Sequence, residues 1–265
     1  MALVEYKELL DAGVHFGHQT SKWNPKMAPY IFMEKNGIHI IDLNKTIVSI
    51  DRAAAALAQI IKSGRKVLFV ATKKQAKEII QEEAKRLKMP YVTDRWLGGM
   101  LTNFVTIRKS LKKMSSIDKL TKDEAFKNIA KRERLMMSRE RDKLEKVLGG
   151  IADLTRIPAA IFIVDAKREH IAIAEAQRLN IPVFAIVDTN SEPDTVDFAI
   201  PANDDAYKSI ALITKVIGKV IEDALAERKR DKDEEDAREG AESEEKQTEE
   251  LIERKYKLEE TETPL

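Results

Sequence analysis

The sequence predicts an α/β protein: an open parallel sheet, covered by helices on both faces, with a pair of antiparallel helices inserted into it. Two observations predict the sheet. Short runs rich in Val, Ile and Phe show little polar alternation, and segments of helical periodicity separate them; both features are typical of parallel sheets. A third observation predicts the insertion, because residues 104–148 contain helical patterns only.

The elements follow in order along the chain. The strands are predicted at 38–41, 67–71, 91–93, 160–165, 183–188 and 198–200, and the helices at 47–62, 72–87, 168–179 and 206–226. In the first helix Ile50, Leu57 and Ile61 recur at helical spacing. Thr72 is expected to cap the second helix, because a threonine hydroxyl accepts hydrogen bonds from free backbone amides.

The insertion is predicted to be an antiparallel coiled-coil hairpin. Apolar residues recur at spacings of three and four from Phe104 to Met114, which is a seam of heptad type, and a second helix is predicted over 123–148. The predicted organisation is 1–103 for the first part of the α/β domain, 104–148 for the hairpin, 149–227 for the second part, and 228–265 for a charged acidic tail, helical or disordered.

Charge is distributed unevenly along the chain. The net charge is only +1, but residues 226–265 hold 16 acidic and 9 basic residues, whereas residues 106–148 hold 14 basic and 7 acidic residues. A local basic stripe is typical of contact with a polyanion, although a solvated helix pair has the same composition. The chain has no cysteine, no signal-peptide pattern and no apolar run of the ~20 residues that a membrane helix needs, so we expect a cytoplasmic protein.

The two tryptophans lie in two unusual runs, residues 13–27 and 94–103, which combine glycines, amides, hydroxyls and cations. Such side chains are typical of RNA contacts, because cations bind phosphates, aromatic faces stack on bases, and amides reach 2′-hydroxyls. Packing is the alternative role of both tryptophans. It is the favoured one for Trp96, which leaves Arg95, Thr102 and Asn103 as contact groups.

The sequence argues against an enzyme. It contains neither a G-x-G-x-x-G after a strand nor a G-x-x-x-x-G-K-[ST], and no cysteine nucleophile. We expect no cofactor, no metal and no small-molecule substrate. The alternatives are a metal site at His15 and His18, which lack a clear fourth ligand, and a Mg²⁺ or acid–base site among several aspartates. Loop and N-cap roles are favoured for these aspartates: Asp188, Asp194, Asp197, Asp204 and Asp205.

Three ordered stretches carry a family resemblance. Residues 13–18 with 23–32, residues 95–103, and residues 158–190 resemble the signatures of the bacterial small-subunit ribosomal protein S-two family. The resemblance runs from about residue 9 to residue 221 and leaves the charged extension uncovered. It implies a flavodoxin-like α/β domain with an inserted coiled-coil hairpin. It also implies a non-enzymatic protein located between the head and body of the small subunit.

The implied partners are small-subunit (16S) ribosomal RNA and neighbouring ribosomal proteins, including the large mRNA-binding one, with no membrane. The residues predicted to bind rRNA are Lys22, Trp23, Asn24, Lys26, Arg95, Thr102, Asn103, Arg108, Lys109, Lys112, Lys113, Lys131, Arg132, Arg139 and Arg141. Two other classes stay open, a nucleotide-binding enzyme and a protein–protein adaptor that uses the hairpin and the acidic tail.

Overall fold

A computed structural model describes residues 3–122 and 130–233. Its centre is a sheet of five strands, β4 (Val67–Val70), β5 (Tyr91–Val92), β6 (Ala160–Val164), β7 (Val183–Val187) and β8 (Phe198–Pro201). The strands are all parallel and lie in the order β5-β4-β6-β7-β8. Numbered within the sheet this is 2-1-3-4-5, the flavodoxin-like order, so the predicted fold class is confirmed.

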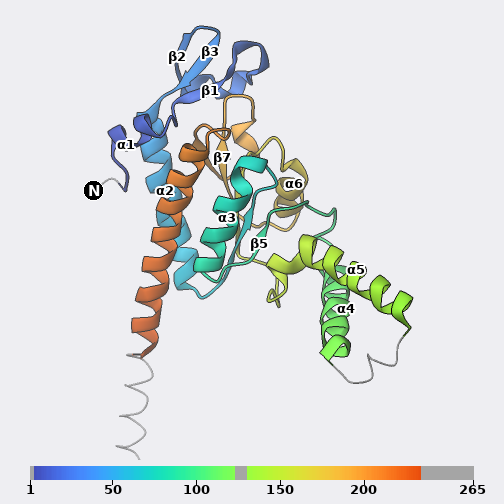
Figure 1. The fold of residues 1–265 in the computed structure, drawn as a ribbon. Helices are drawn as coiled ribbons and strands as arrows, with labels where there is room; N and C mark the ends of the chain where they lie inside the picture. Colours follow the sequence, from blue (N-terminus) through green and yellow to red (C-terminus); the bar gives the residue numbers. More distant parts are fainter. Residues whose placement is uncertain (1–2, 123–129, 234–265) are drawn as a thin grey trace, which may run out of the picture.

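Helices cover both faces of this sheet (Figure 1). One face packs on α2 (Leu43–Lys62), α3 (Lys74–Arg86) and the C-terminal helix, residues 207–233. The other packs on α6 (His170–Arg178), and buried side chains of α4 (Phe104–Lys122) belong to the same apolar cluster. Successive strand residues alternate between the two cores: Phe69 and Phe162 face the first, whereas Leu68 and Ile161 face the second. None of the described helices is long and apolar enough to cross a membrane.

The N-terminal region departs from the prediction. Residues 38–41 do form a strand, β3 (Ile38–Ile41), but it lies outside the parallel sheet. It pairs antiparallel with β1 (Phe16–Gln19) and β2 (Ile31–Lys35) in a separate sheet of three strands, which follows α1 (Tyr6–Asp11) in the chain. The prediction missed β1 and β2 because neither strand has a buried face that would leave an apolar pattern in the sequence. Strand β2 exposes Phe32 and Met33, and its pairing with β3 is irregular.

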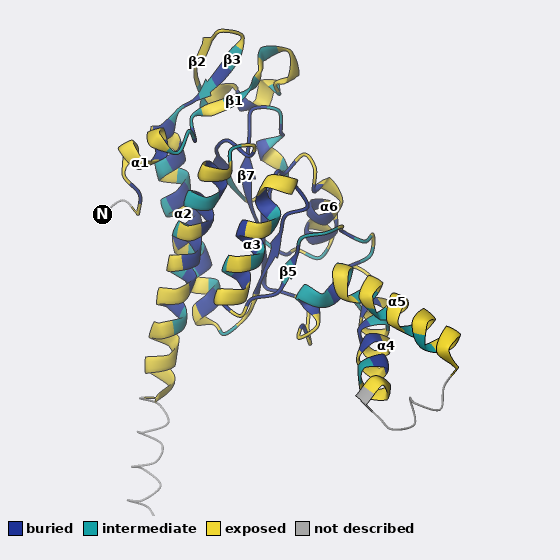
Figure 2. Ribbon diagram, viewed as in Figure 1, coloured by how far each residue is buried: buried dark blue, intermediate teal, exposed yellow. Residues whose placement is uncertain are grey.

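The predicted insertion forms two helices, α4 and α5 (Lys131–Leu148), which stand away from the sheet (Figure 1). Residues 123–129, where the second helix was expected to begin, lie outside the described residues. Ile107, Leu111 and Met114 of α4 are buried and join the core beneath β4 and β6. The outer side of α5 is exposed (Figure 2). The coiled-coil geometry and the domain boundaries stay predictions.

Candidate nucleic-acid interface

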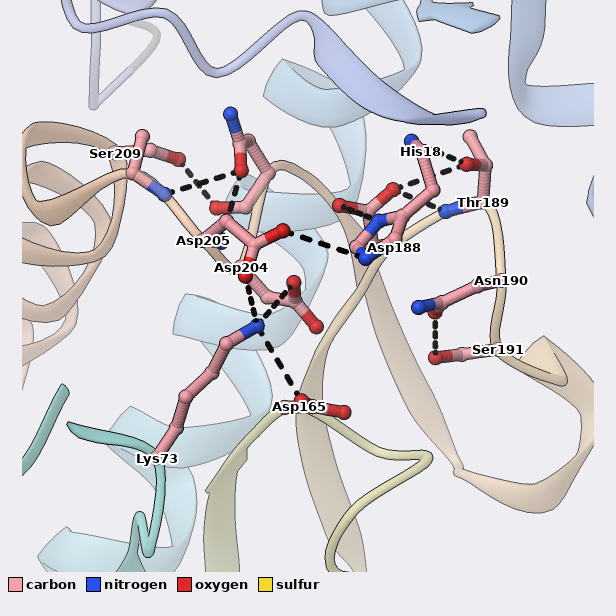
Figure 3. Close-up of polar contacts among 12 residues, drawn as sticks. His18, Lys73, Asp165, Asp188, Thr189, Asn190, Ser191, Asp204, Asp205 and Ser209 are labelled. Atoms are coloured by element: carbon pink, nitrogen blue, oxygen red, sulfur yellow. Dashed lines mark hydrogen bonds and ion pairs between the residues drawn. The ribbon is translucent and has the colours of Figure 1, made fainter. Parts of the chain in front are cut away.

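The carboxyl ends of the parallel strands, where flavodoxin-like folds bind ligands, are occupied by this chain's own side chains. Lys73 follows β4 and lies among three carboxylates (Figure 3). Its Nζ is 2.7 Å from Asp204 Oδ1, 2.7 Å from Asp205 Oδ1 and 3.4 Å from Asp165 Oδ2. Lys73 caps α3 through its backbone, which corrects the expectation that Thr72 is the cap.

Thr72 instead closes the gap between β4 and β6, the switch point of the sheet. Its backbone N–H donates to Glu169 Oε1 at 3.0 Å, its hydroxyl donates to the same oxygen, and Arg168 Nε donates to the Thr72 hydroxyl at 2.9 Å. Burial raises the pKa of Glu169, although the bonds from Thr72 act in the opposite direction. A nucleotide phosphate would meet this carboxylate rather than free backbone amides.

The aspartate prediction is wrong in part. Asp188, Asp204 and Asp205 form an ion-pair network with Lys73 and His18, whose Nδ1 is 2.9 Å from Asp188 Oδ2 and whose Nε2 is 3.3 Å from Asp205 Oδ2. Burial, with like charges nearby, raises the pKa of Asp204 to about 7. The hydrogen bond to Asp188 raises the pKa of His18.

One potential cation site lies in this network. Ligand atoms of His18, Asp188 and Asp204 lie within 4.8 Å of one another. His15 is not part of this group, and burial lowers its pKa. Asn203 Oδ1 accepts from the backbone amides of Asp205 and Ala206 at 2.9 and 3.1 Å, in the turn that leads into the C-terminal helix. The predicted absence of a metal stays a prediction.

The first tryptophan run is attached to the loop after β7. Asn24 N donates to Thr189 O at 2.8 Å, and Asn24 Oδ1 accepts from Lys26 N at 3.0 Å. Lys26 Nζ pairs with Glu192 and, at 3.0 Å, with Asp194. Asn24 and Lys26 therefore hold the loop together. Lys22 is exposed, and the Trp23 ring remains 38% exposed beside His39.

The second run is organised by a residue that the sequence reasoning did not assign, Glu175 of α6. Its carboxylate accepts from Trp96 Nε1 at 3.1 Å, from the amides of Gly99, Leu101 and Thr102 at 2.7, 2.9 and 3.1 Å, and from the Thr102 hydroxyl at 3.2 Å. Trp96 is buried, as its predicted packing role requires. A signal was available, because Glu175 shares the buried face of α6 with Ala172 and Ala176.

The remaining residues of this run have separate surroundings. Thr102 is bound to Glu175, so its hydroxyl is not a free contact group. Asn103 Oδ1 accepts from the Thr106 hydroxyl at 2.9 Å, in the first turn of α4. Arg95 is exposed. Within the described residues, Arg95 forms no ion pair with a carboxylate.

The hairpin cations divide into two groups. Lys113 pairs with Glu140, and Arg141 Nε lies 2.8 Å from Asp118 Oδ1, so these two cations join α4 to α5. The hydrogen bond that Arg141 donates to Asp118 raises the pKa of Arg141. The other predicted cations are exposed and, among the residues that the structure describes, have no carboxylate partner: Arg108, Lys109, Lys112, Lys131, Arg132 and Arg139.

These features define an α/β protein of nucleotide-binding topology whose ligand crevice is filled by its own ion pairs, and whose outlying helix pair carries exposed cations that have no carboxylate partner among the described residues. The chain belongs to the ribosomal protein S2 family, whose model matches residues 9–224. This is a family of structural ribosomal proteins, not of enzymes.

Two bacterial relatives illustrate the similarity. The chain is 73% identical over 240 residues to the small ribosomal subunit protein uS2 of Cytophaga hutchinsonii, covering 91% of this chain and 94% of the relative. It is 62% identical over 236 residues to the small ribosomal subunit protein uS2 of Flavobacterium johnsoniae, covering 89% and 93%. The family expected from the residue motifs is confirmed.

Proposed function

We propose that this chain is a bacterial, ribosome-bound constituent of the small subunit that supports translation by binding 16S rRNA between head and body. It also helps to dock neighbouring ribosomal proteins, including the large mRNA-binding one. The family membership supports the ribosomal role. The observation that carries the RNA contact is the group of six exposed, unpaired cations on α4 and α5.

The physical reason is that an exposed cation without a carboxylate partner gains most from a phosphate. Binding releases the counterions condensed on RNA, so affinity falls with salt in proportion to the number of phosphates contacted. A cation already paired, such as Lys113 or Arg141, contributes less because its existing contact must first be broken. Lys22, Trp23 and Arg95 supply accessible groups at the two tryptophan runs, while Asn24, Lys26, Thr102 and Asn103 hold those runs in shape.

The test measures binding of the chain to small subunits that were prepared without it. In the hairpin variant, Arg108, Lys109 and Lys112 are replaced by Gln. The matched control replaces Lys208, Lys215 and Lys219, which are exposed on the C-terminal helix. Binding is measured between 50 and 300 mM salt. We expect the slope of log affinity against log salt to fall by roughly 2–3 in the hairpin variant, since each lost phosphate contact contributes roughly 0.7–0.9.

An unchanged slope in the hairpin variant, with the control also unchanged, would contradict RNA binding by this surface. If binding persists at high salt and is unchanged by loss of the hairpin cations, the result would support the adaptor alternative. In either case the rRNA part of the proposal fails.

The docking part is supported by the three-stranded sheet, which exposes apolar side chains. Phe32 is 69% exposed and Met33 is 47% exposed. Single exposed apolar residues are ordinary, but two consecutive ones on one exposed strand offer apolar area that a protein neighbour covers well. Replacing both by Ser is expected to lower the amount of at least one neighbouring protein in purified small subunits, measured by mass spectrometry. The control is Val105→Ser, which is equally exposed on α4. Unchanged protein stoichiometry contradicts docking by this sheet.

A further inference from the structure

A concave basic surface lies near the amino ends of the parallel strands, where its lining includes the residues that lead into β4, β5 and β6. Two adjoining grooves of about 500 and about 380 Å³ share Lys66, Asp153 and Leu154 in their walls. Six cations line the two grooves, and Asp153 is the one carboxylate among the described lining residues. We name this surface the basal groove; its cations are Arg65, Lys66, Lys85, Lys88, Arg156 and Arg228.

The charge of the basal groove is not neutralised by its surroundings. Within the described part of the chain, none of its six cations forms an ion pair with a carboxylate. Asp153 is the carboxylate in the groove itself, and three acidic residues on the adjoining helices have partners elsewhere: Glu227 is 2.6 Å from Lys62, and Arg86 holds Glu83 at 2.6 Å and Glu222 at 2.5 Å. A cluster of like charges that lacks internal partners destabilises itself, so it gains from an external anion.

Helix termini explain only part of this cluster. Lys85 lies in the last turn of α3 and Lys88 lies two residues beyond its end, where cations complement the negative end of the helix dipole. Arg65, Lys66 and Arg156 lie in connections between elements, so no helix end accounts for them. The presence of these three cations in one groove is therefore not explained by helix dipoles.

Two glycines allow the walls of the groove to come close together. At Gly64, which has a φ of +81°, a Cβ atom would lie 2.4 Å from Nη2 of Arg228. The guanidinium of the C-terminal helix therefore rests directly on the loop after α2. At Gly150 a Cβ atom would lie 2.2 Å from Tyr91 O, so the chain leaving α5 closes onto β5. Gly150 lines the groove, which makes the basal groove continuous with the base of the hairpin.

We propose that the basal groove is a second phosphate-binding surface, which receives the sugar–phosphate backbone of a folded RNA segment next to the segment held by the hairpin. Lysines act as point charges toward phosphate oxygens, and the arginines can engage two oxygens at once. This inference rests on the proposed rRNA-binding function and extends it from the inserted helices to the sheet domain.

The experiment compares three variants of the full chain on small subunits prepared without it. The groove variant replaces Lys66, Lys85 and Lys88 by Gln; the hairpin variant and the C-terminal-helix control are those defined above. The lysines are exposed, and unchanged melting temperatures confirm that each variant folds. We expect the groove variant to lower the salt slope by roughly 2–3, as three lost phosphate contacts require. Ultraviolet cross-linking of the unmodified chain is expected to place nucleotide adducts on peptides that contain groove residues.

The outcomes separate the two proposals. If the hairpin variant loses salt dependence while the groove variant matches the control, the basal groove is not a phosphate surface and the proposed function stands. If neither variant differs from the control, both proposals fail. If the groove variant binds less well but its peptides cross-link only to protein, an acidic protein neighbour occupies the groove, and the RNA assignment is overturned.

Discussion

Replacing Glu175 by Gln tests how the second tryptophan run is held. The glutamine keeps the size of the side chain but replaces one acceptor oxygen with an NH₂ group. In one orientation this NH₂ group faces the amides of Leu101 and Thr102, and in the other it faces Trp96 Nε1 and Gly99 N. Either way at least two N–H donors lose their acceptor, and in the first orientation the Thr102 hydroxyl also faces the NH₂ group.

Each buried donor left without an acceptor costs about 1–3 kcal/mol, so we expect a loss of about 2–5 kcal/mol in the free energy of unfolding. That is a large share of the roughly 5–15 kcal/mol that stabilises a typical domain. Urea unfolding of the full chain measures it, with the midpoint lowered and the m-value unchanged. Glu82→Gln is the control, since Glu82 is exposed on α3 and should change stability by less than about 0.5 kcal/mol.

The pH dependence gives a second readout of the same carboxylate. Burial alone would raise the pKa of Glu175, but the hydrogen bonds from Leu101, Thr102, Trp96 and Gly99 lower it below its ordinary value. A carboxyl group with a depressed folded pKa stabilises the fold above its unfolded pKa, and loses that contribution as the pH falls through the folded pKa. The unmodified chain should therefore lose more stability than Glu175→Gln below about pH 4.5. A cost under about 1 kcal/mol with identical acid profiles would refute the reasoning.

Two further substitutions test the sheet domain. Lys73→Met removes the cation from among three carboxylates, so we expect the free energy of unfolding, measured in urea, to fall by about 3–5 kcal/mol. Lys77→Met is the control: it breaks a more exposed ion pair and should lower the free energy of unfolding by less than about 1 kcal/mol. Equal losses in the two variants would contradict the network. Gly17→Ala places a methyl group 2.6 Å from Thr189 Cγ2 and should lower the free energy of unfolding by about 1–3 kcal/mol. Gly98→Ala is the control, because a methyl group there meets nothing within 4 Å. A similar loss in both variants would show that the close contact at Gly17 is not the cause.

The parallel sheet could be predicted because burial on both faces leaves a direct trace in the sequence. Phe69, Phe162 and Phe184 all lie in uninterrupted apolar runs, and the helices between them keep strict spacing. The N-terminal sheet left no such trace. Strand β2 of that sheet is almost wholly exposed, and it pairs with β3. The sequence of β3 is apolar and therefore resembles a strand of the buried sheet.

The candidate site was predictable in composition but not in pairing. The sequence indicates which residues are cationic, but not that Lys26 meets Glu192, 166 positions away, or that Lys113 meets Glu140 across the hairpin. Such pairs give Lys26 and Lys113 carboxylate partners within the chain, and their RNA contacts stay predictions. The same limit hid Glu175, whose donors lie 73 to 79 positions earlier in the chain.

The distribution of charge in the folded domain is consistent with the proposed RNA contact being made outside the crevice of the nucleotide-type sheet. At the carboxyl ends of the strands, Asp165, Asp188, Asp204 and Asp205 surround one lysine and one histidine, so this end repels phosphates. At the amino ends, the basal groove and the hairpin base carry cations without carboxylate partners among the described residues. A polyanion therefore attracts one end of the sheet and not the other. This polarity would orient the domain with its hairpin and basal groove against RNA.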